Sequence, residues 1–167
     1  MGLLFLIGFM GSGKSKLAKK SAKRCNVEWI DSDLTIENQQ GVSIPVLFEK
    51  YGEPYFRILE KKFIQELDTS KNAIVSVGGG LPCFNNLIEL LKEKGIVIYL
   101  NRSPKELYQR LIKAKKERPL LASIGNDNLL EFIENLIKQR EDYYLMANHV
   151  LNRDEQLVET IATIFKK

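Results

Sequence analysis

A glycine-rich segment near the N-terminus has the residue types of a phosphate-binding loop. Residues 8–15, Gly-Phe-Met-Gly-Ser-Gly-Lys-Ser, follow the pattern G-x-x-x-x-G-K-[ST]. The glycines allow backbone N–H groups to converge on phosphate oxygens, and the N-terminus of the following helix adds its positive dipole end. Lys14 would then contact the β- and γ-phosphates, and Ser15 would offer its hydroxyl to Mg²⁺. The segment therefore predicts a nucleotide site.

Two aspartates follow the next apolar stretch. Asp31 and Asp33 come after residues 27–30, and α/β sheets bind ligands at the carboxyl ends of their parallel strands. If the chain stays extended there, both carboxylates face the same side. One could then hold Mg²⁺ through water, and the other could orient an alcohol. The alternative is an Asx turn or a helix cap with no catalytic role.

An arginine and a glutamate three residues apart form a second candidate group. Arg57 and Glu60 would share a face of a helix that opens at Pro54. Glu60 could hold the guanidinium so that it binds a carboxylate, although an isolated pair of this kind is usually a solvated salt bridge. Glycines 78–80 would let the backbone approach a ligand closely, or would form a plain flexible turn.

Alternating strand and helix patterns must position these residues. Apolar stretches with β-branched or aromatic residues occur at residues 3–7, 27–30, 73–77, 96–100 and 150–151. Most of them are continuously apolar, which is typical of strands buried on both faces. The stretches between them have helical periodicity. We therefore expect an α/β fold in which helices cover both faces of a parallel sheet.

Several residues predict where helices begin and end. Ser103-Pro104-Lys105-Glu106 reads as a capping box with proline at the first helical position. Gly95 is predicted to end a helix over residues 85–94 in a left-handed conformation. Asp127 is predicted to cap a long helix, and a last helix should begin at about Asp154.

Length and charge limit the class of protein. The chain has 167 residues, which suits a single domain, and a net charge of +4 is compatible with a phosphorylated ligand or a nucleic acid. Lysines in residues 16–23 have no interleaved aromatic residues, so we predict no nucleic-acid binding. The two cysteines and the absence of a signal peptide favour the cytoplasm. The apolar stretches are too short to span a membrane, and we expect a monomer.

One polar stretch does not fit the packed pattern. Residues 114–126 contain four consecutive charged residues at 115–118, followed by Pro119 and, later, Gly125. Loops of this length often serve as active-site lids, and the alternative is a solvated connector.

Taken together, these motifs resemble those of the shikimate kinase family. The matching segments run in order along the chain: Gly8–Ser15, Asp31-Ser32-Asp33, Gly52–Glu60, Gly78–Gly80, Arg118-Pro119-Leu120, and Arg140 with Tyr144. The resemblance implies a fold like that of nucleoside monophosphate kinases: three αβα layers, a five-stranded parallel sheet of order 2-3-1-4-5, and a mobile lid. It also implies a single kinase domain over residues 1–167, with an acceptor-binding region at about 32–61 and the lid at about 113–127.

The activity that the resemblance implies is ATP-dependent phosphorylation of the 3-hydroxyl of shikimate in the chorismate pathway. Asp33 would orient or deprotonate the attacking hydroxyl, while Lys14 and Arg118 would neutralise the transferring phosphoryl group. Ser15 and Asp31 would hold Mg²⁺. The implied shikimate contacts are Asp33, Phe48, Phe56, Arg57, Glu60, Gly79, Gly80 and Arg140. The implied ATP contacts are Gly11, Ser12, Gly13, Lys14, Ser15, Lys16, Arg110, Arg118 and Arg153.

Two other functions stay open at this point. The chain could instead be another kind of small kinase with the same nucleotide motif, such as a gluconate kinase or a nucleoside monophosphate kinase. A non-catalytic nucleotide-binding module that engages nucleic acid or a partner protein is the third possibility. A regulatory GTPase is disfavoured because Asn101-Arg102-Ser103-Pro104 lacks the acid of a guanine-reading motif.

Overall fold

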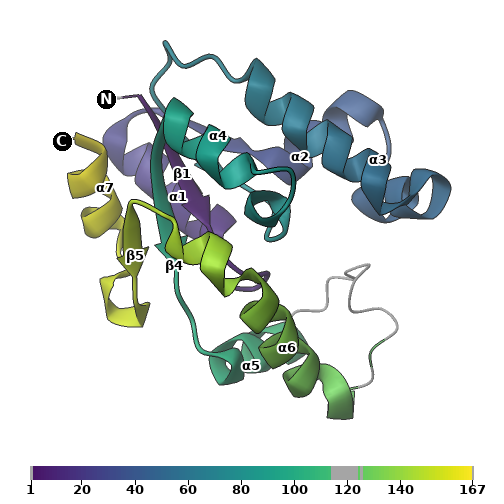
Figure 1. Cartoon of the computed structure of the whole chain (residues 1–167). Coiled ribbons are helices and arrows are strands. Elements are labelled where there is room, and N and C mark those ends of the chain that lie inside the picture. The colour runs from purple at the N-terminus through teal and green to yellow at the C-terminus, as the bar shows by residue number, and fades with distance from the viewer. Residues whose placement is uncertain (1, 114–123, 125, 167) are drawn as a thin grey trace.

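A five-stranded parallel sheet forms the centre of the computed structural model (Figure 1), which describes residues 2–113, 124 and 126–166. The sheet order is β2-β3-β1-β4-β5, and every neighbouring pair is parallel. The strands are β1 (Leu3–Ile7), β2 (Glu28–Asp31), β3 (Ala73–Ser76), β4 (Gly95–Leu100) and β5 (His149–Leu151). The predicted α/β class and strand order are confirmed.

Helices cover both faces of this sheet. They are α1 (Lys14–Cys25), α2 (Ser32–Gln40), α3 (Ile44–Glu66), α4 (Leu87–Lys94), α5 (Pro104–Lys113), α6 (Asn126–Leu145) and α7 (Val158–Lys166), with short 3₁₀ turns η1 (Leu81–Cys83) and η2 (Arg153–Glu155). Figure 1 shows the sheet between α1 on one side and α4 on the other. None of the helices in the described ranges is long and apolar enough to cross a membrane.

The central strand β1 is buried on both faces, which explains why its sequence is continuously apolar. Leu3, Phe5 and Ile7 pack in the core cluster that contains residues of α3 and α4, whereas Leu4 and Leu6 pack with residues of α1 and α7. All five side chains are 3% exposed or less. Burial of each such side chain stabilises the fold by about 1.5 to 3 kcal/mol. A strand with two buried faces has no position where a polar side chain could reach water.

Gly95 differs from its predicted role. Its backbone is extended (φ 177°, ψ −168°), and the residue begins β4 instead of ending α4 in a left-handed cap. A Cβ at this position would lie 2.1 Å from the Leu3 carbonyl oxygen. The left-handed prediction was wrong because glycine is required here by the close approach of β1.

The capping predictions were confirmed at one helix and shifted at others. Ser103 N donates to Glu106 Oε2 at 3.2 Å, and Glu106 N donates to Ser103 Oγ at 3.3 Å, so the capping box is present at α5. Helix α6 begins at Asn126, one residue before the predicted cap Asp127. Helix α7 begins at Val158 because η2 occupies residues 153–155.

The segment between β2 and the middle of α3 contains helical structure that the sequence analysis did not identify. Helix α2 begins directly after β2, and α3 begins at Ile44, well before Pro54. A kink at Gly52, where φ is 77°, divides α3, so Pro54 opens its second half as predicted. Glu37 Oε1 accepts a hydrogen bond from Ile44 N at 2.8 Å, so a side chain of α2 caps α3.

Candidate active site

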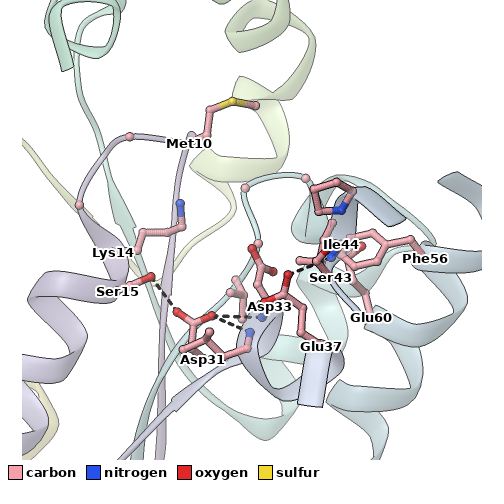
Figure 2. Close-up of a pocket in the computed structure, with 18 of the residues that line it drawn as sticks. Met10, Lys14, Ser15, Asp31, Asp33, Glu37, Ser43, Ile44, Phe56 and Glu60 are labelled. Carbon is pink, nitrogen blue, oxygen red and sulfur yellow. Dashed lines mark hydrogen bonds between the residues drawn. The ribbon is translucent and has the colours of Figure 1, made fainter. Parts of the chain in front are cut away.

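One cavity of about 640 Å³ lies at the carboxyl ends of β1, β2 and β3. Its lining includes Lys14 of α1, Asp33 of α2, Arg57 of α3 and Arg140 of α6. Figure 2 shows Lys14 and Ser15 on one side of this space, with Asp33 and Glu60 on the other. Four helices therefore contribute charged side chains to a single space.

The nucleotide side of the cavity is the loop over residues 8–13 and the start of α1. Lys14 Nζ donates to the carbonyl oxygens of Gly8 at 2.8 Å and Phe9 at 3.0 Å, and Lys14 is 8% exposed. From α5, Arg110 Nη1 donates to the carbonyl oxygens of Gly11 and Ser12, both at 2.9 Å. The loop is thus held in shape by its own lysine and by an arginine of another helix. An anion at the start of α1 would meet N–H groups and the positive end of the helix dipole.

A hydroxyl and a carboxylate meet beside this loop. Ser15 Oγ donates to Asp31 Oδ2 at 2.7 Å. Asp31 Oδ1 accepts from the backbone N–H groups of Asp33 at 3.1 Å and Leu34 at 3.3 Å, which makes Asp31 the N-cap of α2. Figure 2 shows these three hydrogen bonds as dashed lines. A hydroxyl and a carboxylate oxygen are ligands that suit Mg²⁺, which usually keeps several waters and binds one or two carboxylates together with substrate phosphates.

The chain does not stay extended through Asp31 and Asp33, and the structure shows the alternative geometry, a helix cap, at Asp31. The chain enters α2 at Ser32, because an aspartate with extended backbone just before a helix readily caps its free N–H groups. Asp33 therefore lies in the first helical turn instead of continuing the strand. The two carboxylates still line the same cavity.

The acceptor side is the part of the cavity lined by side chains of α2, α3 and α6. Two of its carboxyl groups have raised pKa values. Burial, followed by the nearby charge of Asp31, raises the pKa of Asp33, whose Oδ1 accepts a hydrogen bond from Ser32 Oγ at 3.1 Å. Burial raises the pKa of Glu60 to about 7 despite its bond to Arg57. A Cβ on Gly78 would lie 2.9 Å from Asp33 Oδ1 and 3.0 Å from Glu60 Oε1, so both acids flank this glycine.

Arg57 is buried in a frame of acids and an aromatic ring. Its Nη1 donates to Glu60 Oε2, while Nε and Nη2 donate to Glu53 Oε1 at 3.1 and 2.6 Å. The guanidinium carbon lies 4.0 Å from the centre of the Phe84 ring. Arg57 is 6% exposed and Glu60 is fully buried. The pair is therefore not the solvated salt bridge that an isolated i, i+3 pair would form.

Arg140 brings a second guanidinium to the cavity from α6. It is 6% exposed, and its Nη1 is buried without a hydrogen-bond partner among the residues that the structure describes. One turn later, Tyr144 OH donates to the Gly79 carbonyl oxygen at 2.6 Å. A Cβ on Gly79 would lie 3.1 Å from Met10 N, so the triple glycine rests against the phosphate-binding loop. Helix α6 thus holds both the arginine and the glycine segment in place.

The comparison with protein families decides between the remaining functions. The family model described as shikimate kinase matches residues 10–167. The chain belongs to the shikimate kinase family. It is therefore an ATP-using phosphotransferase of that family.

Individual shikimate kinases are similar over most of their length. The chain is 39% identical to the shikimate kinase of Flavobacterium johnsoniae over 167 residues, which cover 98% of this chain and 97% of that protein. It is 38% identical to the shikimate kinase of Bacteroides thetaiotaomicron over 152 residues, which cover 91% of this chain and 87% of the relative.

Solved structures agree with this assignment. The crystal structure of the B. thetaiotaomicron shikimate kinase matches with a TM-score of 0.87 and 34% identity, covering 98% of this chain and 96% of that one. The shikimate kinase of Acinetobacter baumannii, solved in complex with shikimate, matches with a TM-score of 0.85 and 30% identity, covering 99% and 89%. A gluconokinase from Sinorhizobium meliloti matches with a TM-score of 0.60 but only 13% identity, covering 99% and 91%, so it shares the fold alone.

The other residues implied by the shikimate kinase motifs occupy different places around the cavity. Phe48 and Phe56 line it, with ring centres 5.0 Å apart. The remaining predicted residues that line it are Gly11, Gly13, Lys16, Gly79, Gly80 and Arg110. Ser12 is buried at 2% exposure, and its carbonyl oxygen accepts from Arg110.

Three predicted ATP contacts are not among the residues that line the cavity: Ser12, Arg118 and Arg153. Arg118 lies outside the described residues. Arg153 does not line the cavity, and its Nε lies 3.4 Å from Glu106 Oε1. Glu106 also contacts Arg102, whose Nε donates to the Ser12 carbonyl oxygen at 3.2 Å. Among the contacts of the described residues, Arg153 is thus connected to the phosphate-binding loop through Glu106 and Arg102.

The sequence analysis missed three polar contacts in the site. Ser76 Oγ donates to Asp31 Oδ2 at 2.7 Å, Trp29 Nε1 donates to Ser76 Oγ at 3.1 Å, and Ser32 Oγ accepts from Gly78 N at 2.9 Å. Ser76 pairs with Asp31 in the parallel register of β2 and β3. The signal that could have revealed Ser76 is its position two residues before the triple glycine, at the end of a predicted strand.

Proposed function

We propose that this chain transfers the γ-phosphoryl group of ATP to the 3-hydroxyl of shikimate and releases shikimate 3-phosphate and ADP. The observation that carries the proposal is the single cavity that contains Lys14, Asp33, Arg57 and Arg140. Binding of ATP requires a lysine that contacts phosphate. Binding of a hydroxy acid requires an acid that can orient the alcohol and guanidinium groups that can hold the carboxylate.

The nucleotide side would hold the triphosphate. The N–H groups at the start of α1 and Lys14 would bind phosphate oxygens, and this positioning supplies much of the catalysis in phosphoryl transfer. Ser15 and Asp31 would hold Mg²⁺, which when bound neutralises charge on the phosphates. In this proposal Arg110 lies over the loop, and Arg118 supplies positive charge to the transferring group from the predicted lid. Closure of that lid would exclude water as a competing acceptor.

Asp33 would orient the attacking hydroxyl and accept its proton. Its pKa is raised by burial and by Asp31, and a carboxylate whose pKa lies closer to the working pH accepts a proton more effectively. Ser32, which donates to Asp33 Oδ1, holds the carboxylate in place.

Arg57 and Arg140 would bind the shikimate carboxylate. The Nη1 of Arg140 is buried without a hydrogen-bond partner in the described part of the chain, and such a group costs free energy until an acceptor reaches it. Glu60 fixes the orientation of Arg57, while Phe48 and Phe56 would flank the ring and the Gly79 and Gly80 backbone would lie close to it. A monomeric state and a cytoplasmic location remain part of this proposal.

The test is acceptor-dependent release of ADP by the full chain, with ATP and Mg²⁺ present. We expect release above the ATP-only blank with shikimate and none with gluconate or nucleoside monophosphates. Phosphorus–proton correlation in the NMR spectrum of the product should place the phosphate on the 3-oxygen. Release of ADP with gluconate alone would favour a gluconate kinase instead. Binding of ATP without release of ADP in the presence of any of these acceptors would favour a nucleotide-binding module.

A further inference from the structure

A series of hydrogen bonds leads from an indole ring to the carboxylate that faces Ser15. Trp29 Nε1 donates to Ser76 Oγ at 3.1 Å, and Ser76 Oγ donates to Asp31 Oδ2 at 2.7 Å. Ser15 Oγ donates to the same oxygen, also at 2.7 Å. Trp29 lines the cavity, yet the proposed reaction gives it no role.

Strand register brings these groups together. Trp29 and Asp31 are two residues apart on β2, so their side chains lie on the same face of the strand. Asp31 pairs with Ser76 at the end of β3. On the other side, Lys19 Nζ lies 5.1 Å from the centre of the Trp29 ring, and Lys19 is one helical turn after Ser15. The ring is therefore held between α1 and the end of β3.

The donors and acceptors in this series leave Ser76 little freedom. An indole N–H can only donate, so it occupies a lone pair of Ser76 Oγ. Ser76 is 1% exposed, which keeps water from competing for that hydroxyl. Asp31 Oδ2 at 2.7 Å is a closer acceptor for its proton than the Ile30 carbonyl oxygen at 3.4 Å. Because Asp31 Oδ1 already caps α2, the carboxylate is held at both oxygens.

We propose that Trp29 is a positioning residue for the magnesium and nucleotide side of the site. It acts through Ser76, which fixes the orientation of Asp31. The inference rests on the proposed function only where that function assigns Mg²⁺ to Ser15 and Asp31. Because the chain has one tryptophan, the same contact makes the fluorescence of Trp29 a direct report on this site.

The first test compares ADP binding by calorimetry with and without Mg²⁺, in the absence of shikimate. Trp29→Phe keeps a ring and removes the N–H. We expect it to weaken Mg²⁺-dependent ADP binding about threefold to tenfold, the range for one lost hydrogen bond, and to leave metal-free ADP binding unchanged. Lys19→Gln removes the cation over the ring and keeps the N–H, so it should change neither affinity. Equal weakening with and without Mg²⁺ would overturn the proposal.

The second test asks whether Trp29 acts through Ser76. Ser76→Ala should also weaken Mg²⁺-dependent ADP binding, and adding Trp29→Phe to Ser76→Ala should cause no further loss. Additive losses would mean that the ring has only a structural role, and would overturn the proposal.

The third test uses the unmodified chain. Addition of Mg²⁺ to the ADP complex should change the emission of Trp29, and addition of Mg²⁺ without ADP should not. Unchanged emission while calorimetry shows Mg²⁺-dependent binding would contradict the inference. None of these measurements contains shikimate, so a failure of the proposed phosphoryl transfer would be recognised separately.

Discussion

The two sides of the cavity are built in different ways. The nucleotide side consists mainly of one continuous segment, residues 8–16, whose shape is held by hydrogen bonds from Lys14 and Arg110 to its carbonyl oxygens. The acceptor side consists of side chains from α2, α3 and α6. Two of its polar atoms, Glu60 Oε1 and Arg140 Nη1, are buried without a hydrogen-bond partner among the described residues.

This difference shows which groups recognise each substrate: mainly backbone groups on the nucleotide side and side chains on the acceptor side. A main-chain loop binds phosphate with backbone N–H groups, so it recognises the charge and shape of a triphosphate. The acceptor side instead buries charges whose partners are incomplete, and such groups are costly until a complementary ligand arrives. Selectivity for the acceptor should therefore depend on single side chains, whereas nucleotide binding should tolerate most of the same substitutions.

The largest effect that separates the two sides is expected from Asp33→Asn. We expect kcat to fall at least about 100-fold, the scale of general base catalysis, because the amide cannot accept the proton of the attacking hydroxyl. ADP binding, measured by calorimetry, should stay within about twofold because the phosphate contacts are intact. Glu28→Gln, at an exposed position on β2 outside the cavity, is the matched control. Near-normal turnover of Asp33→Asn would remove this residue from the mechanism.

The next effect is expected from Arg57→Ala. Removal of this guanidinium should weaken shikimate binding by about 2 kcal/mol or more, roughly 30-fold, because the carboxylate of bound shikimate would lose a charged partner. Arg102→Ala is the opposite control, because its Nε contacts the Ser12 carbonyl oxygen of the nucleotide side. It should alter the affinity for ADP and spare that for shikimate. Both affinities can be measured by calorimetry, and an unchanged shikimate affinity in Arg57→Ala would make the Arg57 cluster purely structural.

Glu60 gives the acceptor side a pH dependence. Its pKa is about 7 in the folded chain, against 4.5 for an ordinary glutamate. The folded state therefore binds the proton more tightly, and the stability contributed by this group is fully present below about pH 4.5 and lost as the pH rises through 7. We expect the free energy of unfolding in urea to fall between pH 5 and pH 8 by an amount on the order of 1 to 3 kcal/mol from this group. Glu60→Gln should flatten that decline, and identical pH profiles of the two proteins would contradict the assignment.

The smallest effect is expected from Tyr144→Phe, which should affect both sides together. The variant loses the hydrogen bond from Tyr144 OH to Gly79, which contributes about 1 kcal/mol to stability. Because Gly79 lies against Met10 N and beside the acceptor side, the KM values for ATP and shikimate should rise by similar factors. Steady-state kinetics and urea unfolding provide the measurements. A change in only one KM would show that the glycine segment belongs to one side.

The same contrast explains what could be predicted from the sequence. The phosphate-binding loop is local, so its residues and the strand before it were placed correctly from spacing alone. The parallel sheet followed from apolar stretches, and its strand order followed from the family resemblance. Asp33, Arg57 and Arg140 come from distant segments, and only the ordered set of family motifs predicted that they belong to one site.

The remaining errors come from tertiary contacts that spacing does not encode. Gly95 was predicted from helix-capping rules, but the backbone of β1 decides its role. Ser76 and Trp29 became part of the site through the register of β2 and β3. Helix α2 was missed because its start depends on Asp31 as a cap, and the sequence analysis had kept a helix cap only as the alternative to an extended chain.

The position of Asp31 at the start of α2 has a consequence for how the two substrates influence each other. Its Oδ1 holds the backbone N–H of Asp33, while its Oδ2 holds Ser15. A ligand that draws Asp31 towards one side therefore shifts the first turn of the helix that carries the other carboxylate. We expect the two substrates to influence each other's binding reciprocally. If the bound nucleotide changes the affinity for shikimate by some factor, bound shikimate changes the affinity for the nucleotide by the same factor.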